Sequence, residues 1–121
     1  MSMNYRSEIE KDYLHIVATG SVHSTEEMTS YISRIHNDMA QSGLSKALAD
    51  ETKCHIHISI DELKFAIAQV VEPKELESGV RKSAIICSAM NLHLFRHTFD
   101  SIEAVEIFTD EEEAKRWLAQ G

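Results

Sequence analysis

The spacing of hydrophobic and polar residues predicts strands and helices that alternate along this chain. Residues 5–9 predict a first strand. Residues 13–19 predict a second strand more clearly, because their side chains alternate between the two faces that a strand would have, and Gly20 ends it. The polar residues 10–12 predict the turn between them. The N-terminal part of the chain is therefore expected to form an antiparallel hairpin.

Two longer segments have the helical period instead. The first begins at Ser24 or Thr25 and ends at Gly43, because glycine commonly follows the last turn of a helix. The second begins after Ser59, which has Glu62 three residues later in a capping-box pattern, and Pro73 ends it. The apolar positions of these helices are Met28, Tyr31, Ile32, Ile35 and Met39 in the first and Leu63, Ala66, Ile67 and Val70 in the second.

Short apolar runs predict three buried strands, at residues 46–50, 83–88 and 105–107, with a short helix at 91–99. Residues 52–58 alternate like a strand, yet they suit a loop before the second helix equally well. Strands that alternate with helices imply parallel crossovers. We therefore expect an α/β fold: a small mixed, largely parallel sheet with an N-terminal antiparallel hairpin and about four packed helices.

The last seventeen residues predict a strand, a turn and a closing helix. Asp110 is expected to cap the helix through its side chain, and Glu113 to reach back to the cap. Three acidic residues in the first turn suit the positive end of the helix dipole. The apolar face of this helix consists of Ala114, Trp117 and Leu118.

A family resemblance rests on these same residues. The strand at 105–108, the acidic turn at 110–112 and the pattern Ala114-x-x-Trp117-Leu118 are similar to the SpoIIAA-like branch of STAS-type domains. Residues 84–86 and 48–50 resemble two further strands of that family, the second ending in an aspartate. The resemblance implies one domain over residues 1–121, a small sheet with helices packed on it, and action by binding rather than by catalysis.

The resemblance also draws attention to Ser59. Anti-sigma-factor antagonists of the wider group are switched by phosphorylation of a serine about nine residues beyond the strand aspartate, and counting from Asp50 reaches Ser59. The aspartate and glycine that flank that serine in the family motif are absent from Ile58-Ser59-Ile60-Asp61. Two interpretations stay open: Ser59 only caps a helix, or it is also phosphorylated, where the helix N-terminus would favour the added charge.

Composition narrows the class of partner. The 121 residues include 20 acidic and 12 basic side chains, for a formal net charge of −8, which argues against nucleic acid and anionic membranes. No apolar run approaches the roughly 20 residues of a membrane span, so no integral membrane contact is expected. Two cysteines and no secretory signal favour a cytoplasmic protein.

Seven histidines raise the question of a metal site. His93 and His97 are four residues apart on a predicted helix, and His55 and His57 are two apart, so each pair could share a metal ion. A metal-dependent enzyme with a histidine cluster is therefore one alternative. The chain lacks the Cys-x-x-Cys and His-Glu-x-x-His patterns, and we expect neither an enzyme nor a cofactor.

The remaining evidence concerns binding. Phe65 lies off the apolar face of its helix, so it is expected to be exposed or at an interface. Phe95 and Phe99 either fill the core or line a pocket, which leaves a carrier of a small apolar ligand or lipid as another alternative. We expect a non-enzymatic regulatory module that binds a protein partner or ligand and forms a homodimer, the commonest symmetric oligomer. Its expected surface consists of Asp50, His55, His57, Ser59 and Phe65.

Overall fold

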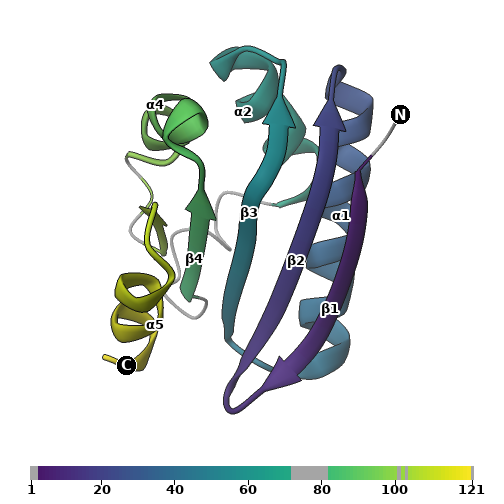
Figure 1. The fold of residues 1–121 in the computed structure, drawn as a ribbon. Helices are drawn as coiled ribbons and strands as arrows, with labels where there is room; N and C mark the ends of the chain where they lie inside the picture. The colour runs from purple at the N-terminus through teal and green to yellow at the C-terminus, as the bar shows by residue number, and fades with distance from the viewer. Residues whose placement is uncertain (1–2, 72–81, 101, 103, 121) are drawn as a thin grey trace.

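The computed structural model describes residues 3–71, 82–100, 102 and 104–120. In these residues, five strands form a single sheet, and four helices connect or follow them (Figure 1). The elements in chain order are β1 (Asn4–Glu10), β2 (Tyr13–Val22), α1 (Thr25–Ser42), β3 (Lys46–Ile56), α2 (Ile60–Val70), β4 (Lys82–Cys87), α4 (Ala89–Phe99), β5 (Val105–Phe108) and α5 (Glu111–Ala119).

The order of strands in the sheet is the same as their order in the chain. β1 and β2 form the antiparallel hairpin, with Asn4 opposite Thr19 and Glu10 opposite Tyr13. All the other neighbouring strands are parallel, as crossover helices require. The predicted fold class is thus confirmed.

Two strands are longer than the sequence pattern predicts. Gly20 does not close β2, which continues to Val22; Gly20 has a φ of 112° within the strand, and the pairing with β3 shifts register just before it. β3 runs to Ile56 because its second half pairs with this extension of β2, so most of the ambiguous segment 52–58 is strand. Asp50 accordingly lies in the middle of β3 and not at its end.

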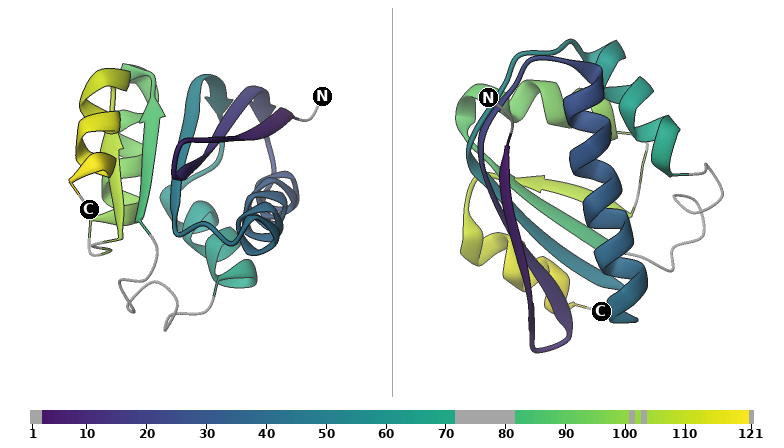
Figure 2. Two further views of the ribbon diagram at one scale, coloured as in Figure 1. Left: turned by 90° about the horizontal axis from the view of Figure 1, so that it is seen from below. Right: turned by 90° about the vertical axis from the view of Figure 1, so that its right-hand side faces the viewer.

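Helices cover both faces of the sheet (Figure 2). α1, α2 and α4 pack on one face, here called the inner face, and α5 packs on the other, outer face against β3, β4 and β5. The inner face has the larger core, which includes Ile16, Met28, Tyr31, Leu63, Ile67 and Phe95. The outer core consists of Tyr13, Leu48, Ala84, Ile86, Ala114 and Leu118.

The helix ends follow most of the predicted capping signals. The Ser24 side chain accepts a hydrogen bond from the Glu27 amide at the start of α1, and Gly43 ends that helix with a φ of 72°. The capping box of Ser59 and Glu62 is present in full. The predicted stop at Pro73 lies outside the described residues; α2 ends at Val70.

The predicted side-chain cap of α5 is wrong. Asp110 occupies the N-cap position, but its side chain makes no capping hydrogen bond, and its backbone carbonyl accepts from Ala114 instead. The carboxylates of Glu111, Glu112 and Glu113 already place negative charge at the positive end of the helix dipole. In the part of the chain that is described, no helix is long and apolar enough to span a membrane.

Candidate functional site

The carboxyl ends of β2 and β3 carry a cluster of exposed histidines. The two strands end side by side, and the amide of His57 donates a 2.8 Å hydrogen bond to the Val22 carbonyl. This contact stacks the ring of His57 on that of His23, with centroids 4.6 Å apart and an angle of 7° between the rings. The ring centroids of His55 and His57 are 6.5 Å apart. The pair of histidines noted in the sequence is therefore joined by a third, His23, which follows the end of β2.

The N-terminus of α2 adjoins this cluster in the chain. Ser59 Oγ accepts from the Glu62 amide at 3.1 Å, and the Ser59 amide donates to Glu62 Oε1 at 3.0 Å. The hydrogen bonds from Ser59, above all the one from its backbone, hold the pKa of Glu62 below its ordinary value. Ser59 is exposed, so its hydroxyl is both a helix cap and a group that solvent can reach.

Two large apolar side chains are exposed on the helices that begin at this end of the sheet. Phe65 on α2 is 57% exposed, as its position off the apolar face predicts, and Met90 in the first turn of α4 is 81% exposed. The start of α4 is held to β3, because the Asn91 side-chain amide donates to the Cys54 carbonyl at 3.0 Å. Single exposed apolar residues are common, so Phe65 and Met90 mark a surface without proving its use.

A buried acid lies deeper in the same strand. Glu51 is 5% exposed, and its carboxylate accepts a 2.6 Å hydrogen bond from the hydroxyl of Tyr31 on α1. Loss of hydration raises the pKa of Glu51 to about 7, although the hydrogen bond from Tyr31 works in the opposite direction. Burial beside Glu51 also raises the pKa of Tyr31 well above its ordinary value, so Tyr31 stays a hydrogen-bond donor.

The Tyr31–Glu51 pair lines a cavity of about 160 Å³ between the inner face of the sheet and its helices. The floor includes Ala47, Ala49 and Ser83, which are smaller than the branched residues usual in central parallel strands. Met28 and Ile35 from α1 and, from the other helices, Leu63, Ile67, Phe95 and Phe99 also line it.

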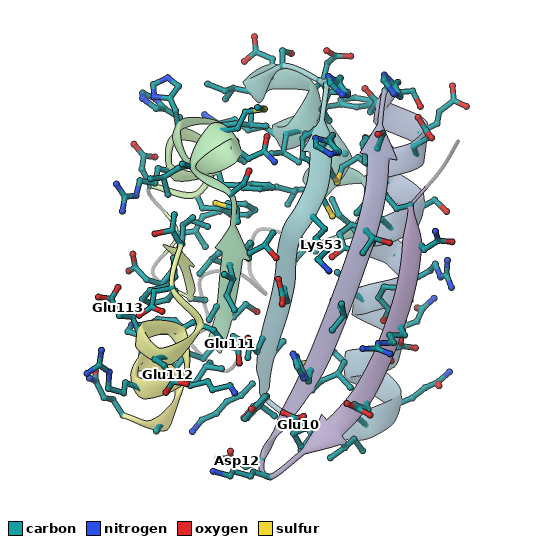
Figure 3. All side chains as sticks on the ribbon, viewed as in Figure 1. Glu10, Asp12, Lys53, Glu111, Glu112 and Glu113 are labelled. Atoms are coloured by element: carbon teal, nitrogen blue, oxygen red, sulfur yellow. The ribbon has the colours of Figure 1, made fainter. Side chains whose placement is uncertain are left out.

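Asp50 faces a different part of the molecule. Its Oδ1 accepts hydrogen bonds from the Thr52 amide at 3.1 Å and from the Thr52 hydroxyl at 2.7 Å. Together with Arg6 and Lys53, these residues line an open depression of about 390 Å³ along β1, β2 and β3 (Lys53 is labelled in Figure 3). Asp50 is therefore six residues from the strand end where the histidines gather.

Comparison with solved structures identifies the fold. An anti-sigma factor antagonist from Mycobacterium paratuberculosis matches with a TM-score of 0.65 at 7% identity, over 98% of this chain and 95% of that one. A DUF3478-family protein with a SpoIIAA-like fold from Shewanella loihica PV-4 matches with a TM-score of 0.57 at 22% identity, over 97% and 93%. The anti-sigma factor antagonist SpoIIAA, in its unphosphorylated form, matches with a TM-score of 0.56 at 13% identity, over 98% and 99%.

The chain has a SpoIIAA-like fold. This confirms the resemblance that the closing strand, acidic turn and helix suggest. No family model matches the sequence, and no curated protein matches it either. At these identities the likeness is one of architecture, and functional residues have to be argued from this chain itself.

Two histidines predicted as metal ligands lie on α4 of the SpoIIAA-like fold. His93 and His97 are exposed, and their rings are 4.2 Å apart at 53°. Among the described residues, they do not join His55 and His57, or any third donor, in a group of three potential ligands. A metal ion shared by His93 and His97 alone stays a prediction.

One group of three donors occurs elsewhere, on the outer face of the β1–β2 hairpin. Glu8, Glu10 and His15 offer ligand atoms that all lie within 4.8 Å of one another. His15 Nδ1 is 3.3 Å from Glu10 Oε1, but both ring nitrogens are shielded from solvent and neither makes a hydrogen bond. Tyr13 donates to Glu10 at 2.9 Å, and this bond is the main cause that lowers the pKa of Glu10. Nitrogen and carboxylate donors of this kind suit Zn²⁺ and similar cations.

Further acidic residues lie on the hairpin turn and on α5, which packs on the same face of the sheet. Figure 3 shows Glu10 and Asp12 at the hairpin turn and Glu111, Glu112 and Glu113 at the start of α5. Sequence reasoning missed this group because Glu8, Glu10 and His15 come from two strands and share no local motif. The sequence does contain one signal for this group: antiparallel pairing of the predicted hairpin places Glu8 directly opposite His15.

Proposed function

We propose that this chain is a non-enzymatic regulatory module that binds a protein partner through the carboxyl-end surface. This surface is defined by the exposed side chains His23, His55, His57, Ser59 and Phe65. The observation that carries the proposal is the exposure of Phe65 on the helix that begins at this edge, in a fold found in two anti-sigma factor antagonists.

The composition of the surface supports a protein partner. An aromatic side chain that is more than half exposed loses apolar contact with water when a partner covers it, and aromatic residues often dominate interface energies. The three histidines and Ser59 add exposed hydrogen-bonding groups to the carboxyl-end surface. The net charge of −8 favours a partner with a basic surface.

The state of the two cysteines supports a role without catalysis. Cys54 is 2% exposed and Cys87 is 1% exposed. Burial raises the pKa of the Cys54 thiol to about 12 and that of Cys87 to about 11. Since the thiolate is the nucleophile, neither cysteine is suited to covalent catalysis at neutral pH.

Ser59 is the proposed point of regulation on this surface. Its hydroxyl is exposed, and a phosphate there would lie at the N-terminus of α2 while displacing the cap interaction with Glu62. We expect phosphorylation to change partner affinity. Incubation with kinases of the host, followed by phosphate mapping with a known substrate as positive control, tests this; an unmodified Ser59 would remove the idea.

The partner proposal is tested with a matched pair of variants. Phe65→Ala removes the exposed aromatic on α2, whereas Ile9→Ala removes a 61% exposed apolar side chain from β1, near the hairpin turn. The immobilised wild-type protein and both variants are used to isolate host proteins, and cross-linking with mass spectrometry maps the contact. We expect the wild type and Ile9→Ala to retain the same protein, cross-linked to α2, and Phe65→Ala to lose it. Equal retention by Phe65→Ala would contradict the proposal.

Sedimentation velocity of the same variants tests the predicted homodimer. If two copies associate through the carboxyl-end surface, Phe65→Ala shifts the protein to the monomer and Ile9→Ala does not. A wild-type protein that is monomeric at high concentration would exclude the dimer and leave the partner proposal intact.

A further inference from the structure

We propose that the cavity under α1, α2 and α4 binds a small apolar alcohol, with Glu51 as its hydrogen-bonding anchor. This site is distinct from the carboxyl-end surface and goes beyond the role of a partner-binding module. The proposal depends on three features of the cavity: its volume, its small-residue floor and the single carboxyl group among its described lining residues.

The volume sets the size of the ligand. About 160 Å³ is comparable to an apolar cavity of about 150 Å³ that stays dry and accepts benzene. A substituted six-membered ring therefore fits. The cavity exists because Ala47, Ala49 and Ser83 replace the larger side chains that would otherwise fill the space beneath the helices.

The polar group sets the chemistry of the ligand. Tyr31 donates to Oε2 of Glu51, and the other oxygen, Oε1, is assigned to the ligand. A hydroxyl group can donate to this oxygen without bringing a charge into the cavity. An ammonium group could also donate, but desolvating a charge costs far more than desolvating a hydroxyl. A carboxylate ligand would face the acid directly. These costs of burying charge favour an alcohol, and the other polar side chains that line the cavity, His36 and Ser83, are also able to bond a hydroxyl group.

The Tyr31–Glu51 hydrogen bond also holds the anchor in place. Tyr31 comes from α1 and Glu51 from β3, and both side chains are almost completely buried. A buried donor–acceptor pair with fixed side chains presents the carboxyl group in one orientation, which reduces the entropy lost when a ligand binds. Glu51 is therefore preorganised for a ligand rather than free to adapt to one.

The test compares two ring compounds of nearly equal shape. Benzyl alcohol carries the hydroxyl, and ethylbenzene replaces it with a methyl group. The full chain, labelled in its alanine and isoleucine methyl groups, is titrated with each compound and followed by NMR. We expect saturable shifts at Ala47, Ala49 and Ile35, with benzyl alcohol binding about tenfold more tightly than ethylbenzene.

Two variants separate the cavity from its anchor. Ala49→Leu fills the floor and should abolish binding of both compounds, while Ala68→Leu adds the same group at an exposed position of α2 and should not. Glu51→Leu removes the anchor and should eliminate the preference for the alcohol. If Ala49→Leu does not fold, as judged by circular dichroism, Ala47→Val provides a smaller change with the same expectation.

Several results would overturn the proposal. Benzyl alcohol could give no saturable shift up to its solubility limit, or its shifts could fall on surface methyl groups and persist in Ala49→Leu. Equal affinities for the two compounds in the wild type would show that Glu51 does not recognise the hydroxyl. None of these results bears on Phe65 or on the partner experiment.

Discussion

Tyr31 and Glu51 join helix α1 to strand β3 through a 2.6 Å hydrogen bond in the interior of the protein. The bond satisfies a carboxyl group that would otherwise be buried at a high cost in free energy. It also lies at the cavity on the inner face of the sheet, so the same two residues belong to the proposed ligand site.

The stability of the protein should depend on pH through Glu51. Its pKa is about 7 in the folded state, against an ordinary value of 4.5, so the folded protein binds this proton more tightly than the unfolded chain. The stabilisation is complete below about pH 4.5 and is lost as the pH rises through 7, by on the order of 1–3 kcal/mol. Urea unfolding between pH 4.5 and 8 measures it.

Glu51→Gln provides the control for this pH dependence. The amide cannot titrate, so the decrease in the free energy of unfolding between pH 5 and 7.5 should become smaller in this variant. The other titratable groups that face Glu51 are Asp50, Cys54 and Cys87, which interact with it electrostatically, and Tyr31, which donates a hydrogen bond to it. An identical slope in the wild type and in Glu51→Gln would assign the effect to other groups.

Removing the Tyr31 hydroxyl should destabilise the fold. Tyr31→Phe leaves the buried Glu51 carboxyl without this donor, at a cost of about 1–3 kcal/mol, and should raise the pKa of Glu51 further. Tyr13→Phe is the control, because Tyr13 donates to the far more accessible Glu10 and its loss should cost less than about 1 kcal/mol. Chemical denaturation measures both; equal costs would mean that burial of the acceptor is unimportant.

The Ser59 cap should be separable from any regulatory role of that residue. Ser59→Ala removes the acceptor for the Glu62 amide and should reduce stability by about 1 kcal/mol. Ser59→Asp keeps a capping oxygen and should restore most of that loss. A shift in the thermal unfolding midpoint measures both effects. If Ser59→Ala is as stable as the wild type, the capping box contributes little in this protein.

Both cysteines should resist thiol reagents in the folded protein. Cys54 and Cys87 are buried, and their raised pKa values keep them protonated at neutral pH. Labelling with iodoacetamide at pH 7.5 should therefore be slow in buffer and fast in denaturant. Because the unfolded thiols ionise at a lower pH than the folded ones, stability should also decrease above about pH 9. Rapid labelling of the native protein would contradict the burial.

The sequence predicts the elements of this fold well where periodicity and end signals agree. The first helix has both, from Ser24 to Gly43, and its bounds are confirmed. The second half of β3 could not be distinguished from a loop, because the alternation of residues 52–58 does not reveal that this segment pairs with β2 beyond Gly20. The predicted side-chain cap of α5 is wrong for a different reason: an aspartate at the N-cap position does not determine where its side chain points.

The site was harder to predict because it depends on which face a residue occupies. Once β3 extends past Asp50, strict alternation places Glu51 on the same covered face as Ala47 and Ala49. Tyr31 was expected on the buried face of its helix, so the pair could have been inferred from register alone. The cavity could not, since its volume depends on how side chains from three helices meet the sheet.

The agreement between strand order in the sheet and strand order in the chain has a consequence during synthesis. Each new strand can join the edge of the sheet already formed as the chain leaves the ribosome, because its neighbour has already emerged. The exception is the outer face of β3 and β4, where Leu48, Ala84 and Ile86 remain uncovered until α5 is made. We therefore expect the nascent chain to expose this apolar surface, which is prone to aggregation, until α5 is translated.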